Sequence, residues 1–552
     1  MCRREQVRSV SRAPFRVVVL VCLAGLLPFS DAAAADRTNI PLKNWGGFSV
    51  FRDAVYDDLE RLVTAGLADR VLLSTKPISR IEAARIVARA IENIRRDEAG
   101  TYNGRRDLEP VLDRLTVEFE VELASLGVRL SGDYDRAPGY FSLVPVDRAQ
   151  AYAGYANHQF SLANNRGLSF KRGVNSGQTF ESRAQVGDFL TVYLQPELLE
   201  NEDFQAARLA AGYAKLTLFN LELLVGRDSL WWGPSLHGSL GLSNNAAPLD
   251  QVRIGSAEPF LLPWVGPWVG PTKVLFFLAQ LESRRDHPRA KLSGMRLDVA
   301  PFRSLEIGAW RAVLFDGDDR PRLSLEDYPT AIFNPGAGDP INGSIGAPRF
   351  RNNSLYGLDA DLRFHDVSQY YLPTRDLRVY GEFYSDDTCC NNNWFTANVL
   401  PRQGAIGWLA GVHFLGLLNQ DGLDARAEYA KSSRDSYDHF QFTDGYWTRG
   451  HVISHSMGTH GEDYYARVSY RATRPLLIGI ELNRAYVGST IQGIVPLRQR
   501  RLGGGLDLSY SFWDRYSVFV QYLVSDVKNR QFVAGNDGFD HLLRVEFTRS
   551  FR

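Results

Sequence analysis

Beyond about residue 150, the chain alternates between apolar and polar residues with a period of two. In the segment 377–384, leucine, valine, glycine and phenylalanine alternate with arginine, tyrosine, glutamate and tyrosine. The same alternation recurs in 356–364, 423–429, 502–512 and 518–524. A period of two predicts β-strands that are apolar on one face and polar on the other.

The length of these alternating runs favours strands that cross a membrane. They reach about 8–11 residues, close to the length that a tilted strand needs to span a bilayer, whereas strands of soluble sandwiches are mostly shorter. The most apolar later stretch, 260–281, contains Pro263, Gly266, Pro267, Gly270 and Pro271 and therefore does not fit a membrane helix. We predict a mainly β fold, with a large antiparallel transmembrane β-barrel over residues 131–552. About 400 residues, at roughly 20–25 per strand, give about 16–20 strands.

The residues before the barrel have a helical period instead. Apolar residues recur at helical spacing from Val55 to Leu67, from Ala84 to Ile94 and from Leu108 to Leu126. Ser79 and Glu82 have the spacing of a capping box at the start of the second stripe. We predict a small α-helical periplasmic region over residues 36–130. It weakly resembles surface-layer-homology modules, which bind cell wall, so peptidoglycan is a possible partner; a small helical plug or cap is the alternative.

The first 35 residues have the three parts of a secretory signal. Five arginines precede the apolar run Val17–Leu27, and four small residues, Ala32–Ala35, follow it. The run is too short to cross a bilayer as a helix. Cleavage near Ala35 leaves 58 basic and 61 acidic residues, a net charge of −3. We therefore predict an exported protein.

Composition excludes several classes of function. The 552 residues contain 63 basic and 63 acidic side chains, and this balance argues against a nucleic-acid partner. Aromatic residues make up 12% of the chain, which together with the low net charge argues against disorder. After cleavage the cysteines are the adjacent pair Cys389 and Cys390, which lack the spacing of a structural zinc site. We predict neither a metal nor a cofactor.

The final strand has a feature typical of outer-membrane barrels. Leu543, Val545, Phe547 and Phe551 share one face, and a terminal aromatic residue is common in such proteins. Arg552 departs from that pattern because it displaces the aromatic residue by one position.

The sequence contains little that indicates catalysis. It has no Gly-x-Ser-x-Gly elbow, phosphate-binding loop or zinc-protease motif; His451 and His455 have helical spacing but no glutamate between them. A polar barrel interior explains the carboxylates of the strands without chemistry: Asp359, Asp361, Asp424, Glu428 and Glu481. We predict a protein that is not an enzyme and has no catalytic residue.

One long loop between strands, 431–463, is rich in aromatic residues and histidines. Aromatic rings can stack on sugars while polar groups bond their hydroxyls, so this loop is a candidate glycan-contact site. An ordinary external loop with interface aromatics is the equally weighted alternative. The candidate contact residues are Tyr437, Tyr446, Trp447 and His451.

The most specific stretch runs from Val225 to Pro248. It begins as a strand end and continues as a loop with bulky tryptophans, turn glycines and side-chain amides. Its successions Trp-Gly-Pro (232–234), Gly-Ser-Leu (238–240) and Ser-Asn-Asn-Ala-Ala-Pro (243–248) resemble the Wzi-type capsule-assembly family of outer-membrane proteins. The order of signal, helical region and long β region also resembles that family.

The resemblance implies an eighteen-stranded barrel in the outer membrane of a Gram-negative cell, closed on the periplasmic side by helices and narrowed by loops. It also implies a lectin-like role, without catalysis, in attaching or organising capsular or extracellular polysaccharide. A porin-like channel for sugars or other small solutes is the alternative. The motif residues have either a structural role, which we favour, or a polysaccharide-binding role: Arg227, Trp231, Trp232, Gly233, Pro234, Ser239, Asn244, Asn245 and Pro248.

Overall fold

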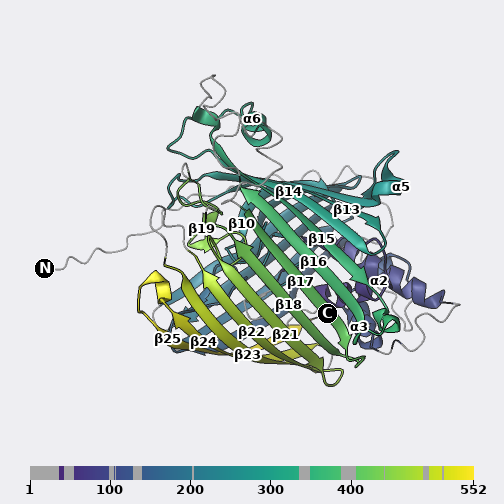
Figure 1. Cartoon of the computed structure of the whole chain (residues 1–552). Helices are drawn as coiled ribbons and strands as arrows, with labels where there is room; N and C mark the ends of the chain where they lie inside the picture. Colours follow the sequence, from purple (N-terminus) through teal and green to yellow (C-terminus); the bar gives the residue numbers. More distant parts are fainter. Residues whose placement is uncertain are drawn as a thin grey trace.

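In the computed structural model, eighteen long strands form a closed antiparallel barrel (Figure 1). Each strand pairs with the long strands that precede and follow it in the sequence, and the last pairs with the first, where Arg148 faces Ser550. The strands are β2 (Phe141–Ala156), β5 (Gly173–Val186), β6 (Leu190–Asn201), β7 (Phe204–Leu218), β8 (Leu221–Asp228), β10 (Leu249–Ser256), β12 (Pro271–Gln280), β13 (Lys291–Phe302), β14 (Leu305–Phe315), β15 (Asn352–Phe364), β16 (Thr374–Asp386), β17 (Ile406–Leu417), β18 (Leu423–Ser432), β21 (Glu462–Arg471), β22 (Leu476–Val487), β23 (Gln499–Phe512), β24 (Tyr516–Lys528) and β25 (Gly538–Ser550).

The structure describes residues 36–42, 55–97, 105, 107–128, 140–201, 204–334, 348–386, 406–434, 436–439, 442–488, 497–512 and 515–551. The predicted signal peptide, the pair Cys389 and Cys390, and Arg552 lie outside these residues.

The wall of the barrel separates apolar from charged residues by strict alternation. On β22, Ile480 and Leu482 are 57% and 63% exposed on the outer face, whereas Glu481 between them is 1% exposed and points inward. Successive side chains of a strand point to opposite faces, so the outer face of the barrel is apolar and the inner face polar. The predicted mainly β, antiparallel barrel is therefore confirmed.

The two ends of the barrel differ in their connections. Most connections at one end are short turns, such as 187–189, 219–220 and 303–304, and β25 ends there. Most connections at the other end are long, including 229–248 and 433–461. We call these the short-turn end and the long-loop end. In outer-membrane barrels, short turns face the periplasm and long loops face the outside.

Four helices form a head at the short-turn end, α1 (Val55–Thr64), α2 (Arg80–Arg95), α3 (Glu109–Glu118) and α4 (Glu120–Ser125) (Figure 1). The third predicted helix is divided in two at Phe119, whose backbone leaves the helical region. Ser79 caps α2 by accepting a hydrogen bond from the Glu82 amide at 3.3 Å. The reciprocal half of the expected capping box is not formed, because the Glu82 carboxylate binds Lys273 of the wall instead.

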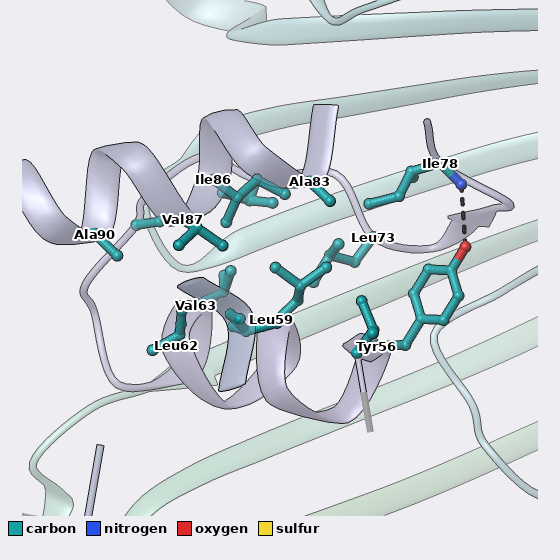
Figure 2. Close-up of a cluster of buried hydrophobic side chains, with 14 of the residues drawn as sticks. Tyr56, Leu59, Leu62, Val63, Leu73, Ile78, Ala83, Ile86, Val87 and Ala90 are labelled. Carbon is teal, nitrogen blue, oxygen red and sulfur yellow. Dashed lines mark hydrogen bonds between the residues drawn. The ribbon is translucent and has the colours of Figure 1, made fainter. Parts of the chain in front are cut away.

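The apolar stripes of these helices pack on one another, as Figure 2 shows. Leu59, Leu62 and Val63 of α1 face Val87 and Ala90 of α2, all within one buried cluster. The Tyr56 hydroxyl accepts a hydrogen bond from the Ile78 amide at 3.2 Å (Figure 2). The head therefore has an apolar core of its own.

Shorter elements lie in the connections, and some of them extend beyond the wall. They are β1 (Thr75–Lys76), β3 (Phe160–Ser161), β4 (Ser169–Phe170), β9 (Trp231–Trp232), β11 (Phe260–Leu261), β19 (Trp447–Thr448), β20 (His451–Val452), α5 (Gly266–Val269) and α6 (Tyr328–Phe333). Across the part of the chain that the structure describes, no helix is both long and apolar enough to cross a membrane.

Candidate functional site

The connection between β8 and β10 folds into the barrel. We call residues 229–248 the motif segment; every residue from Ser229 to Ala246 is buried. Its short strand β9 pairs with β1 of the head, where Trp232 faces Thr75. The Gly233 amide donates to the Ser74 carbonyl at 2.8 Å. The motif segment thus joins the long-loop half of the lumen to the head.

Glu382 of β16 anchors the middle of the motif segment. Its carboxylate accepts hydrogen bonds from the Ser239 hydroxyl at 3.1 Å, the Leu240 amide at 2.7 Å and the Ser235 hydroxyl. Gly233 has a φ of 141°, and a Cβ at this position would lie 2.2 Å from the Glu382 carboxylate. The close approach of this carboxylate therefore requires glycine.

A second wall carboxylate, Glu428 of β18, holds the next turn of the motif segment. It accepts hydrogen bonds from the amides of Leu236 and His237 at 2.8 and 2.9 Å. It also accepts one from the Tyr380 hydroxyl at 2.6 Å. Both anchors are buried, and each accepts its hydrogen bonds from neutral donors that are already in place.

The two tryptophans of the motif segment are completely buried in different clusters. Trp232 packs edge-on against Phe277 and near Trp310, with ring centroids 5.5 and 6.2 Å apart. Trp231 belongs to the core of the head. The Lys76 ammonium lies 5.9 Å from the Trp231 ring, and burial lowers the pKa of Lys76 to about 8.

The asparagines of the motif segment bond to the head and to the loop 433–461. The Asn244 amide donates to the Leu42 carbonyl at 2.9 Å, and its oxygen accepts from Ser229 at 2.8 Å. The Asn245 amide donates to the Val452 carbonyl at 2.9 Å. The hydrogen bonds of both asparagine side chains are therefore made to other residues of this chain.

The remaining predicted motif residues have different surroundings. The Pro234 carbonyl accepts a hydrogen bond from Arg378 at 2.7 Å, and Pro248 is half-buried. Arg227 lies outside the motif segment, on the outer face of β8, where it forms two 2.7 Å hydrogen bonds with Asp250 of β10. The structure therefore separates Arg227 from the other eight motif residues.

The four predicted glycan-contact residues also divide into two groups. Tyr437 and Tyr446 are completely buried, and the Tyr437 ring stacks between Tyr384 and Tyr446, at centroid distances of 4.7 and 6.0 Å. Neither ring is accessible to a ligand, because both are packed in the core beneath the loop. Trp447 and His451 are only partly buried, on the hairpin formed by β19 and β20. The contact hypothesis therefore rests on this second pair.

A buried histidine of the motif segment was not predicted as a site residue. His237 Nε2 lies 3.2 Å from an Asp463 carboxylate oxygen, and its ring stacks on Tyr465 at 4.0 Å. Burial lowers the pKa of His237, but the nearby Asp463 outweighs it and the net shift is upward. The His455 ring is 6.0 Å away, and burial lowers its pKa to about 4.

The head is held to the wall by ion pairs. Glu60 of α1 pairs with Arg378 at 2.7 Å and Arg426 at 2.8 Å, and it contacts His413 at 2.9 Å. Burial opposes ionisation of Glu60, but the two guanidinium groups hold its pKa well below the usual range. Further pairs join the head to strands around the barrel, Glu82–Lys273, Arg61–Asp424 and Asp36–Arg183. Sequence alternation placed the wall residues in the lumen, but did not identify their partners.

A small cleft remains at the short-turn end, between α1 and the wall. Its charged lining includes Asp57, Arg61, Arg426, Arg467 and Arg471. Within the described ranges, no three His, Cys, Asp or Glu side chains are grouped in a way that would hold a metal ion.

Residues 149–542 match the family model of the capsule assembly protein Wzi. The chain belongs to this family. An uncharacterized 55.8 kDa protein in the cps region of Klebsiella pneumoniae is 25% identical over 312 residues, which span 53% of this chain and only 55% of that relative. The solved structure of Wzi from Escherichia coli is 19% identical and has a TM-score of 0.66, with coverage of 91% of this chain and 99% of that one. That protein is described as an outer-membrane carbohydrate-binding β-barrel involved in group 1 capsule assembly.

These similarities confirm the predicted family and the eighteen-stranded fold. They also confirm the predicted location, so the chain is an outer-membrane β-barrel of the capsule-assembly family.

Proposed function

We propose that this barrel binds exported capsular or extracellular polysaccharide at its long-loop end, and attaches or organises it at the cell surface without catalysis. Family membership supports a role in capsule assembly, and the description of the Escherichia coli protein as carbohydrate-binding supports the ligand class. The observation that carries the proposal is the filling of the lumen from both ends, by the head and by the motif segment. A polymer therefore meets a loop surface rather than an open pore.

The hairpin β19–β20 is the best-supported contact surface. The Trp447 carbonyl accepts a hydrogen bond from Arg285 at 3.0 Å, and the Arg449 amide donates to Glu282 at 2.8 Å. These bonds hold the hairpin in one geometry, which lowers the entropic cost of binding. We expect the partly exposed ring of Trp447 to stack on a sugar ring. Burial lowers the pKa of His451, so its imidazole is neutral at pH 7 and can both donate to and accept from hydroxyls.

The direct test of binding uses the purified barrel and the polysaccharide of its own cell, followed by titration calorimetry. We expect Trp447→Ala and His451→Ala together to weaken binding at least tenfold. Trp268→Ala is the matched control, because this 74% exposed tryptophan lies in α5 at the short-turn end. Equal affinity in all three proteins would exclude the hairpin as the contact. No binding by the wild-type barrel would exclude the proposed function.

In cells, deletion of the gene is expected to move polysaccharide from the cell-bound to the released fraction. Unchanged partitioning would contradict a role in attachment. Planar-bilayer recordings distinguish this proposal from the channel alternative, since we expect little steady conductance from a barrel filled in this way. A large steady current would favour a porin-like channel.

The motif residues are proposed to have a structural role, which their burial and bonds within the protein support. The position of the head at the short-turn end supports a periplasmic plug. Contact of the head with peptidoglycan stays a prediction.

A further inference from the structure

Five cationic side chains lie close together near the long-loop end of neighbouring strands. We call them the basic rim: Lys431 of β18, Arg484 of β22, Arg498 just before β23, Arg500 of β23 and Lys528 of β24. Four of them are on strands, and all four share the parity of lipid-facing residues. Arg484 follows the exposed Leu482, and Arg500 precedes the exposed Leu502, two residues apart in each case.

The strand register places three of these cations, Lys431, Arg500 and Lys528, in one row across five strands. Lys431 faces Glu462, and Glu462 faces Tyr486. Tyr486 in turn faces Arg500, and Arg500 faces Lys528. Neighbouring strands are about 4.8 Å apart, so Arg500 and Lys528, which face each other on adjacent strands, are close enough to contact one lipid head group.

A second row marks the depth of the basic rim in the membrane. Tyr429 and Tyr464 face each other with ring centroids 4.6 Å apart, and Tyr464 faces Arg484 on the next strand. Aromatic girdles of outer-membrane barrels lie at the membrane–water interface. The row that contains Arg500 is two residues further along the strands, roughly 7 Å from these rings at the usual rise per residue. It therefore lies at the depth of head groups in the outer leaflet.

The charges of the basic rim are only partly neutralised. Glu462 is 3.3 Å from Lys431 and 3.8 Å from Arg498. Lys528 is 3.4 Å from Asp537 and 3.7 Å from Asp526. Within the described part of the chain, neither Arg484 nor Arg500 has a carboxylate at ion-pair distance. The five cations and three carboxylates leave an excess of two positive charges.

Tyr486 holds two of the guanidinium groups in position. Those of Arg484 and Arg498 lie 5.2 and 5.0 Å from the centre of its ring. Arg484 also donates a hydrogen bond to the Tyr486 hydroxyl, and its remaining N–H groups can bind an anion.

The next four strands around the barrel after β24 lack this feature at the same end. The corresponding outward residues on β25, β2, β5 and β6 are Phe539, Tyr155, Val174 and Glu200. The basic rim is therefore not continued onto these four strands.

We propose that the basic rim binds the phosphate groups of a phosphorylated glycolipid in the outer leaflet. The outward orientation, the depth beside the aromatic girdle and the unneutralised arginines all favour an anionic lipid head group. Arginine binds phosphate through two parallel hydrogen bonds, and its aliphatic stem lies well against an acyl chain. This site is on the opposite face of the wall from the filled lumen, and it does not depend on the proposed polysaccharide binding.

The test compares the wild-type barrel with the triple variant Arg484→Gln, Arg500→Gln, Lys528→Gln in neutral detergent. Lipid binding is measured by native mass spectrometry and by titration with bisphosphorylated lipid A. The probes for comparison are the dephosphorylated lipid, inorganic phosphate and polygalacturonate as an acidic polysaccharide. A matched control, Arg289→Gln, Lys291→Gln, Arg349→Gln, removes three cations from the long-loop end elsewhere.

We expect the triple variant to bind bisphosphorylated lipid A at least tenfold more weakly, and the control to bind like the wild type. Lysines at positions 484 and 500 should restore most of the affinity. Equal affinity for the lipid with and without phosphates would overturn the proposal. So would selective loss of polygalacturonate binding, which would assign the basic rim to polysaccharide. Resistance of the folded barrel to unfolding by SDS before heating verifies that each variant is intact.

Discussion

The head and the motif segment both fill the lumen, but they are attached to the barrel wall in different ways. The head is held by ion pairs of both polarities, with Glu60 between Arg378 and Arg426 as the centre and Arg61 paired with Asp424. The motif segment is held by two wall carboxylates that accept neutral donors, and by aromatic packing around Trp232. Both partners thus contribute charged groups at the head–wall interface, whereas the two anchors of the motif segment, Glu382 and Glu428, belong to the wall.

This difference predicts how each region fails. Removing one partner of a buried ion pair leaves the other charge without compensation. A segment held by packing fails mainly when a large side chain is lost and a cavity remains. Four variants or conditions test this contrast, beginning with the largest expected effect.

Trp232→Ala should have the largest effect, because the ring is completely buried between Phe277 and Trp310. We expect the free energy of unfolding, from urea titration in detergent micelles, to fall by about 3–5 kcal/mol. The exposed Trp268 is the control, and Trp268→Ala should change stability little. A small effect of Trp232→Ala would mean that the motif segment does not depend on aromatic packing.

Glu60→Gln should loosen the head while the barrel stays folded. Arg426 then loses its close carboxylate, whereas Arg378 keeps Asp361 at 2.7 Å. We therefore expect the free energy that holds the head to the wall to fall by about 3 kcal/mol, at the lower end of the range for a broken buried ion pair. Faster proteolysis of residues 55–128 is the measurement. Glu92→Gln is the control, because Glu92 forms an exposed pair with Arg96. Equal proteolysis of both variants would show that the ion pairs do not retain the head.

Glu382→Gln should have a smaller effect on the motif segment. The glutamine amide keeps one acceptor oxygen, but it directs an NH₂ group towards the donors of Ser235, Ser239 or Leu240. We therefore expect the stability of the motif segment to fall by about 2 kcal/mol. Hydrogen exchange of the amides in 233–242 should increase while exchange in the head stays the same. Glu200→Gln on the exposed end of β6 provides the control. Faster exchange in the head as well would show that the two fillings are not independent.

Acidification should weaken the contact between the motif segment and the loop 433–461. The pKa of buried His455 falls from 6.5 to about 4, so protons bind preferentially to the unfolded state. Its stabilising contribution is fully present above pH 6.5 and is lost as pH falls towards 4, by about 1.4 kcal/mol at pH 5.5. His237 has the opposite sign, because its raised pKa favours the folded state on acidification. The comparison of pH profiles, rather than of absolute stabilities, therefore isolates His455.

The measurement is the unfolding free energy between pH 7.5 and 5.5 for the wild type and His455→Gln. Loss of stability on acidification should be smaller in the variant. Identical slopes would mean that His455 does not remain neutral in the folded protein.

Much of the fold follows from local periodicity. The alternation around Glu481 is enough to predict a strand with one lipid face, and the helical spacing from Val55 to Leu67 is enough to predict α1. The division of the third helix at Phe119 was not predicted, because Pro110 and the apolar stripe fit one continuous helix. The second half of the predicted capping box does not form because Glu82 binds Lys273 of the wall, a charged partner that is distant in sequence.

The candidate site was predictable in part. The motif was recognisable from the tryptophans, glycines and asparagines of 225–248, and a structural role was favoured for it, but its partners in the wall and the head were not predictable. Tyr437 and Tyr446 show why, since the same mixture of aromatic and polar residues suits a sugar surface or a core. Only the path of the loop distinguishes these uses, and that path depends on contacts with Tyr384 and Leu240, which are remote in sequence.

The sequence by itself determined the barrel, the helical head and the family, and it predicts the export signal. Each of these depends on the local pattern of residues or on a contiguous motif. Tertiary structure alone decided that Glu382 and Glu428 hold the motif segment, that Glu60 pairs with two wall arginines, and that the cations of four strands and one connection form a rim. The physical reason is strand register. Alternation determines which face a side chain occupies, but register and loop paths determine which residues it meets.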